Sequence, residues 1–418
     1  MKTFHIEAPQ FQNWTCQSCG ECCRGYHLVV ISAEEKQRIE SQRWTKADGV
    51  DPDRMILPHG AKFRLGHKPT GECVFLDAES RCLIHARFGE QAKPLACRVY
   101  PYAIHPAGEK LVVSLRFSCP AAAANIGEPL ATQLRTLQQL ARLIVPGDFK
   151  TVPPPPVLDK ARLTWPDFFR FVTRLDKTLA DTDAPLPLRV LRALDWLGAV
   201  ERAKFDQITG SDADEVLGAL ARRAGQKLPR MPEASERPSA FGRLLFRTLV
   251  FQYARRDTLK DLETPLRHRR EMFNAVLKFA LGSGAVPAFR PGLPKAVFSA
   301  VEKPWGQVTP EIEAMLTRFF RVKIRGLHFC GPAYFNWPLV DGFRALCLLL
   351  PVTMWIARWL AAGETADKLS AAHVARALSI VDHHHGYTDQ LGSGAARRRV
   401  RLLTQRDDIA KLCVWYWR

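Results

Sequence analysis

Cys16-Gln17-Ser18-Cys19-Gly20-Glu21-Cys22-Cys23 is the most distinctive stretch of this sequence. Two intervening residues let a tight turn present two thiolates to one metal or cluster, and Gly20 permits the positive φ that such a turn often needs. Its first three cysteines match the start of a bacterial iron–sulfur run, but Cys23 follows at once instead of after three more residues. Because adjacent side chains point in different directions, we expect Cys22 and Cys23 to serve two sites, or one of them to be a structural or redox bystander.

Four more cysteines follow at wider spacing, so that eight of the eleven lie in the first 120 residues: Cys16, Cys19, Cys22, Cys23, Cys73, Cys82, Cys97 and Cys119. We predict that these eight are metal ligands. Their number allows two four-cysteine sites, and equally a three-cysteine cluster with an open iron. Cys330, Cys347 and Cys413 lie in apolar surroundings, where a free cysteine usually behaves as a small buried hydrophobe, and we exclude them from the site.

Disulfides are the main alternative, since an even number of cysteines in a small region can form a covalent framework. The first twelve residues lack the apolar segment of a signal peptide, so we expect a cytoplasmic protein whose thiols stay reduced. Single, scattered cysteines favour a 4Fe–4S cluster over Zn²⁺, because a zinc site usually takes its ligands from paired C-x2-C motifs.

Positive charge accompanies the cysteines. Guanidinium groups beside thiolates offset their negative charge and lower their pKa. We assign this role to Arg24 and Arg98, which adjoin Cys23 and Cys97. Ordinary surface positions are the better interpretation for the other nearby cations, which are Arg81, Arg87, Lys93 and Arg116. A packed or solvated position, not ligation, is expected for His85 and His105. The histidine triplet 383–385 follows an expected helix end, and since consecutive histidines cannot all face one site, we expect a loop or helix stop there.

The net charge of +18 raises nucleic acid, membrane or acidic protein as partners. The excess lies away from the cysteines, because residues 1–125 hold 16 Lys and Arg against 13 Asp and Glu. The densest run, at Arg397, Arg398, Arg399 and Arg401, has no interleaved aromatics and favours a solvated helix face over a nucleic-acid surface. The apolar stretch 345–357 is interrupted by Pro351 and is short for a bilayer span, which favours a buried helix.

The pattern predicts an α+β protein: a small, loop-rich cysteine domain with a few short strands (1–127), a helix and Pro-rich connector (128–157), and a larger all-α domain (158–418). Strand-like alternation occurs at 27–31, 99–104 and 111–117. Helical periodicity predicts helices at 128–145, 165–179, 188–205, 212–224, 240–255, 267–281, 310–322, 340–360, 371–381 and 397–416. Ser211, three residues before Asp214, and Thr309, before Pro310, read as start signals.

Four segments together resemble the CxxCxxCC family of zinc- or iron-chelating domains, the YkgJ-like cysteine-cluster proteins: Cys16 to Cys23, Gly71-Glu72-Cys73-Val74-Phe75-Leu76-Asp77, Cys82-Leu83-Ile84-His85, and Cys97-Arg98-Val99-Tyr100-Pro101-Tyr102. The resemblance covers about residues 16–120. It implies a bound metal or 4Fe–4S cluster. Flagellin lysine N-methylases are related to this family, and that branch implies methyl transfer from S-adenosylmethionine to lysine side chains of a protein. The methylase branch spaces its first cysteines more widely, so this tight run looks closer to the generic chelating domain.

The sequence therefore supports two main functional hypotheses. One is a cluster-dependent protein-lysine N-methyltransferase with a protein substrate. The other is a non-enzymatic protein that stores, senses or carries metal or electrons. A zinc-stabilised nucleic-acid binder is a weaker third. An enzyme needs a cleft beside the cysteines, whereas a chelator can close every coordination position.

Overall fold

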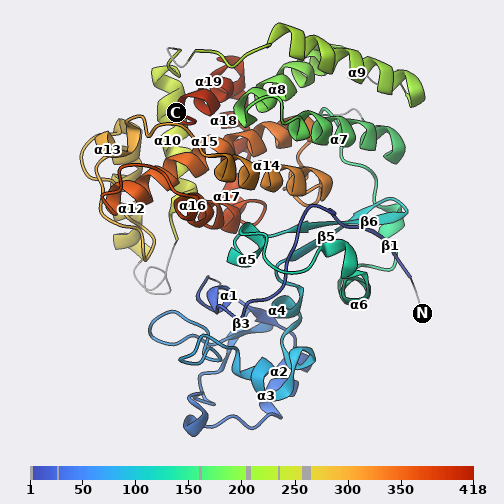
Figure 1. Cartoon of the computed structure of the whole chain (residues 1–418). Helices are drawn as coiled ribbons and strands as arrows, with labels where there is room; N and C mark the ends of the chain where they lie inside the picture. Colours follow the sequence, from blue (N-terminus) through green and yellow to red (C-terminus); the bar gives the residue numbers. More distant parts are fainter. Residues whose placement is uncertain (1–2, 26–27, 160–161, 204–208, 234–235, 257–264) are drawn as a thin grey trace.

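The computed structural model describes residues 3–25, 28–159, 162–203, 209–233, 236–256 and 265–418 (Figure 1). His27 and Phe205, each at one end of an expected element, lie outside these ranges. The architecture is α+β, as predicted: short strands occur between His5 and Leu115, and helices make up most of the rest.

One sheet contains β1 (His5–Glu7), β6 (Lys110–Leu115) and β5 (Tyr102–Ala107), in that order. β1 runs parallel to β6, and β5 pairs antiparallel with β6. Ala107 pairs with Lys110, so Gly108 and Glu109 form a two-residue turn, and Gly108 has the positive φ (70°) that such turns require. Two of the three expected strands are thus confirmed within a few residues.

A second sheet, of order β2 (Val30–Ile31), β4 (Lys62–Leu65) and β3 (Ile56–His59), belongs to the cysteine region. Short helices surround it: α1 (Glu21–Gly25), α2 (Ala33–Glu40), α3 (Leu83–Phe88), α4 (Leu95–Val99), η1 (Lys46–Asp48) and η2 (Glu90–Ala92). Ile31, Ile39, Trp44 and Phe75 form a small apolar core here. This core is separate from the main one.

The helical body contains α7 (Trp165–Ala180), α8 (Leu186–Arg202), α9 (Gly210–Lys227), α10 (Ala240–Ala254), α12 (Pro265–Leu281), α13 (Phe298–Glu302), α14 (Pro310–Arg325), α15 (Leu339–Gly363), α16 (Ala371–His384), α17 (Asp389–Gly392), α18 (Gly394–Gln405) and α19 (Asp408–Trp415). In Figure 1 it lies above the blue cysteine region, with the sheet of β1, β5 and β6 between them. The predicted helices agree with these bounds, with three exceptions.

The segment expected as one helix at 397–416 divides into α18 and α19 because Asp407 adopts a left-handed conformation, with φ of 56°. The helix expected from residue 128 starts later, as η3 (Leu130–Thr132) and then α6 (Leu134–Ile144). α9 starts at Gly210, so Ser211 is not its cap. Thr309 does cap α14, since its side chain accepts a hydrogen bond from the Ile312 backbone N–H.

α15 is long and apolar enough to cross a membrane by length and composition, but 94% of its most apolar window is buried inside the protein. Pro351 lies within this helix and does not end it, in agreement with the single helix predicted over 340–360. α15 is the central helix of the main core, which confirms the prediction of a buried helix.

The sheet of β1, β5 and β6 shares the main core with the helical body. The Phe117 and Phe319 rings, after β6 and on α14, meet edge to face at 5.1 Å. At the end of α14, a Cβ on Gly326 would lie 2.4 Å from the Ser114 Cβ, so the two elements touch at backbone distance. The expected boundary at residue 127 stays a prediction, while β5, β6 and α5 (Pro120–Ala123) pack with helices from beyond it.

Candidate metal centre

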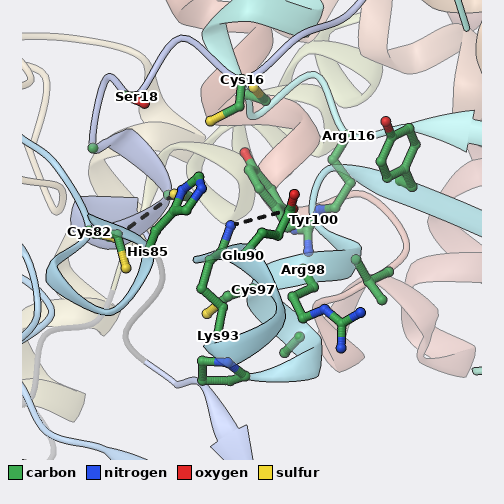
Figure 2. A pocket seen from close by; sticks show the side chains of 18 of the residues that line it. Cys16, Ser18, Cys82, His85, Glu90, Lys93, Cys97, Arg98, Tyr100 and Arg116 are labelled. Atoms are coloured by element: carbon green, nitrogen blue, oxygen red, sulfur yellow. Dashed lines mark hydrogen bonds and ion pairs between the residues drawn. The ribbon is translucent and has the colours of Figure 1, made fainter. Parts of the chain in front are cut away.

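All eight amino-terminal cysteines line one cavity of about 750 Å³. They come from the loop before α1, from α1, from the turns around β-bridges at Cys73 and Cys82, from α4, and from the start of α5. Figure 2 shows Cys16, Cys82 and Cys97 on different walls of this cavity. All eleven cysteines of the chain are free thiols, which argues against the disulfide alternative. The assignment of the eight as ligands stays a prediction.

Gly20 shapes the loop that carries the first cysteines. Its φ is 71°, as the sequence predicts for this turn. A Cβ at this position would lie 2.9 Å from the Ser80 carbonyl oxygen and 3.0 Å from Leu76 Cδ1. The Arg24 guanidinium donates to the Cys19 carbonyl oxygen (2.9 Å) and closes the turn. The loop therefore needs glycine both for its backbone conformation and for its close packing.

Cys22 and Cys23 face each other, and their sulfurs are 3.9 Å apart. The expectation that adjacent thiols point apart is wrong here, because both cysteines lie in the short helix α1 and their side chains turn toward the same cavity. Two thiolates on one tetrahedral zinc, each at ~2.3 Å, stand about 3.8 Å apart. These neighbours can therefore bind the same ion.

This pair belongs to a group of five thiols, which are those of Cys22, Cys23, Cys73, Cys82 and Cys97. The Cys73 backbone N–H donates to the Cys23 carbonyl oxygen (2.9 Å), and the Cys23 and Cys73 thiols share a hydrogen bond. Burial, with smaller contributions from nearby Cys22 and Cys82, raises the pKa of Cys97 to about 12. The hydrogen bond with Cys23 raises the pKa of Cys22, and burial adds to that effect. Cys22 and Cys97 therefore stay protonated at neutral pH unless a cation joins them.

The remaining three thiols, of Cys16, Cys19 and Cys119, lie toward the helical body. The Trp14 indole N–H donates to Cys119 Sγ at 3.3 Å. Burial raises the pKa of Cys119, and Cys19 contributes in the same direction. Burial also raises the pKa of Cys19, with contributions from Cys22 and Cys16, so Cys19 connects the two groups.

Lys93 is the cation that acts on the thiols. It lowers the pKa of Cys22, Cys82 and Cys97, against the larger effect of burial on the last two. Figure 2 shows it pointing into the cavity between Cys97 and Glu90. From the sequence we had assigned the lowering of the thiol pKa values to Arg24 and Arg98 instead. Arg98 lines the cavity, but Arg24 binds Glu72, at 3.1 Å, and other neighbours of α1.

The three cysteines excluded at the level of sequence lie elsewhere, as expected. Cys330, Cys347 and Cys413 are buried in the helical body, where the Cys413 thiol contacts the Cys347 carbonyl oxygen. His105 packs against His328, with ring centres 5.4 Å apart, and burial lowers its pKa to about 4. Of the histidines considered, His85 does line the cavity.

Three further cavity residues were not predicted to belong to the site: Arg116, expected at an ordinary surface position, Tyr100, quoted only as part of the Cys97 segment, and Tyr387. Arg116 and Tyr100 follow or precede strands of the first sheet, and Tyr387 comes from the loop after α16 in the helical body. The Arg116 guanidinium lies 3.6 Å from the Tyr387 ring centre, and it also donates to the His383 carbonyl oxygen (3.1 Å). The helical body therefore forms one wall of the cavity.

The donor chemistry fits a thiolate-bound metal, because soft sulfur ligands select zinc and iron–sulfur centres. Among the described residues, no three Cys, His, Asp or Glu side chains stand close enough to hold an ion in their present rotamers. A metal at the five-thiol group would thus require thiol side chains to rotate inward around the Cys22–Cys23 pair.

Lys93→Met tests the electrostatic role of Lys93. Because Lys93 lowers the pKa of Cys22, Cys82 and Cys97, its removal should slow their alkylation severalfold in metal-free protein near pH 8, whereas Cys119 should react as before. The rates are measured peptide by peptide by mass spectrometry. Lys36→Met removes a similarly half-buried lysine of the same region and is the control. Equal rates in both variants would contradict this role.

One family model matches the chain, and it covers the cysteine-rich region. Neither the search of curated proteins nor the search of solved structures found a significant match. Residues 15–120 match the model of the CxxCxxCC family, described as a "Putative zinc- or iron-chelating domain". The matched segment runs from just before Cys16 to just after Cys119, so it contains every cysteine of the cavity. Residues 15–120 are thus a CxxCxxCC domain, and this match supports metal binding by that part of the chain.

Proposed function

We propose that the protein binds zinc or iron through the thiolates of its amino-terminal cavity. The observation that carries this proposal is the convergence of eight cysteines, spread between residues 16 and 119, on one cavity. Thiols gathered in such number around one cavity destabilise one another when they ionise, and a metal ion is the ligand that best compensates them. The CxxCxxCC match supports the same chemistry.

Within the cavity, the five-thiol group is the primary site. The 3.9 Å separation of Cys22 and Cys23 favours a single tetrahedral ion there, completed by thiols from Cys73, Cys82 or Cys97. The 4Fe–4S cluster predicted from the spacing remains the second arrangement. It is favoured by the cavity's volume and by the further thiols of Cys16, Cys19 and Cys119, which can complete a cluster or bind a second ion.

Substituting Cys22 with Ser tests the primary site. After anaerobic purification, we expect the unaltered chain to contain stoichiometric zinc or iron and the Cys22→Ser chain to have lost it. Cys347→Ser, which changes a buried cysteine of α15, should retain the metal. Metal content and acid-labile sulfide are measured together, because zinc without sulfide rejects the cluster and iron with sulfide supports it. Equal metal content in both variants would contradict the site.

A second function, transfer of a group to a protein substrate, is favoured by the size of the cavity. About 750 Å³ falls within the ~300–1,000 Å³ typical of sites for small organic molecules. Part of the wall is free of thiols and is formed by Tyr100, Arg98, Arg116 and Tyr387. A purely structural zinc site closes around its ion and leaves no such space. Lysine N-methylation with S-adenosylmethionine is the reaction that the resemblance implies for such a cavity.

Calorimetric titration of the metal-loaded protein with S-adenosylmethionine tests this second function. Binding should release measurable heat and should weaken in Arg98→Ala, which removes a cation from the thiol-free wall. S-adenosylhomocysteine is titrated in the same way for comparison. No heat with either compound would leave metal handling, sensing or electron transfer as the function of the centre.

A further inference from the structure

A short connection between β6 and α5 carries two cavity residues, Arg116 and Cys119. It contains no regular secondary structure of its own, and Cys119 lies at its end, directly before α5. The Cys119 backbone N–H donates to the Arg116 carbonyl oxygen (3.2 Å), and the two residues between them, Phe117 and Ser118, are bonded from the helical body.

Asp382, in α16 of the helical body, supplies these bonds. Its Oδ2 atom accepts from the Phe117 backbone N–H (2.5 Å) and from the Ser118 backbone N–H (3.4 Å). One turn earlier in α16, the Ser379 hydroxyl donates to the Ser118 carbonyl oxygen (3.1 Å). The two residues before Cys119 are thus held by a helix more than 260 positions away in the sequence.

Lys323, in α14, fixes the carboxylate in turn. Its Nζ atom lies 2.6 Å from Asp382 Oδ1 and donates to the Leu115 carbonyl oxygen at 3.0 Å. Neither side chain of this ion pair exposes any surface. His328 Nδ1 lies 3.1 Å from the same ammonium group. The ion pair therefore joins α14 to α16, and it bonds to both ends of the segment 115–118 that leads to Cys119.

A buried ion pair adds little net stability, since desolvation of the two charges offsets their attraction. Its better-attested contribution is to select one arrangement of the chain, and here that arrangement is the path of residues 115–119. Removing Asp382 would leave the buried ammonium without its counter-ion and would take away the carboxylate that accepts from the Phe117 and Ser118 backbone N–H groups.

We infer that Asp382 and Lys323 are positioning residues of the metal centre, which hold Cys119 so that its thiol faces the other cavity thiols. The inference rests on the proposed metal-binding function. Through this network the helical body sets the geometry of a ligand of the cysteine domain. Metal binding then depends on contacts that the CxxCxxCC segment alone does not contain.

Cobalt binding to the full chain tests the inference. Co²⁺ gives a thiolate-to-metal charge-transfer absorbance that grows with the number of bound thiolates. We expect Asp382→Ala to lower this absorbance to the level of Cys119→Ser, and the double variant to lower it no further. Co²⁺ affinity should fall by roughly 10- to 100-fold, as when other groups that orient metal ligands are lost. Alkylation of Cys119 in the loaded protein should become faster.

Asp408→Ala is the matched control. Asp408 is also fully buried and accepts a backbone N–H, from Ser239 at 2.7 Å, but it joins α19 to the start of α10. It should leave the cobalt spectrum unchanged. Ser379→Ala removes only the bond to the Ser118 carbonyl oxygen and leaves no charge unpaired, so it gives a smaller change of the same kind even if Asp382→Ala does not fold.

Three outcomes are distinct. A full cobalt spectrum with unchanged Cys119 protection in Asp382→Ala and Ser379→Ala overturns the inference and leaves the metal centre intact. A full spectrum in Cys119→Ser overturns it as well, because Cys119 is then no ligand. Failure of the unaltered chain to give any charge-transfer absorbance contradicts the proposed function itself.

Discussion

Thiols that are buried together cannot all ionise without a cation among them, and this constraint governs the amino-terminal region. Burial and the neighbouring thiols together raise the pKa of Cys97 to about 12. Lys93 opposes that effect at three of the cysteines but is a single charge. A metal ion supplies the larger positive charge that several thiolates require. The small core around Trp44 and Phe75, the turn at Gly20 and the segment before α5 all hold thiols at this one cavity.

Local patterns predicted much of this arrangement. Helical periodicity and the cysteine spacing depend on neighbours a few residues apart, so the helices of the body, the α+β class and the positive φ of Gly20 could be read from the sequence. The exclusion of Cys347 and Cys413 followed from their apolar surroundings. The convergence of eight thiols was expected from the number and type of residues, but which cysteines share a site could not be predicted.

Other features depend on contacts between distant segments, which leave no local pattern. Nothing near Lys93 marks it as the cation of the thiols, because that role comes from where α4 packs. The shared direction of Cys22 and Cys23 depends on the helical turn that α1 adopts. Tyr387 and Asp382 reach the cavity region from the end of α16, and Asp407 divides a segment with uninterrupted helical periodicity. In each case tertiary packing overrides or adds to the sequence signal.

Protonated thiols that become thiolates on metal binding make proton release the most direct test. Zn²⁺ is titrated into the reduced, metal-free chain near pH 7, and the protons released are counted from binding heats in buffers of different ionisation enthalpy. The account predicts about one proton for each ligating thiol, hence about four for a tetrahedral thiolate site, and weaker binding as the pH falls. Binding without proton release, or no binding at all, would contradict it.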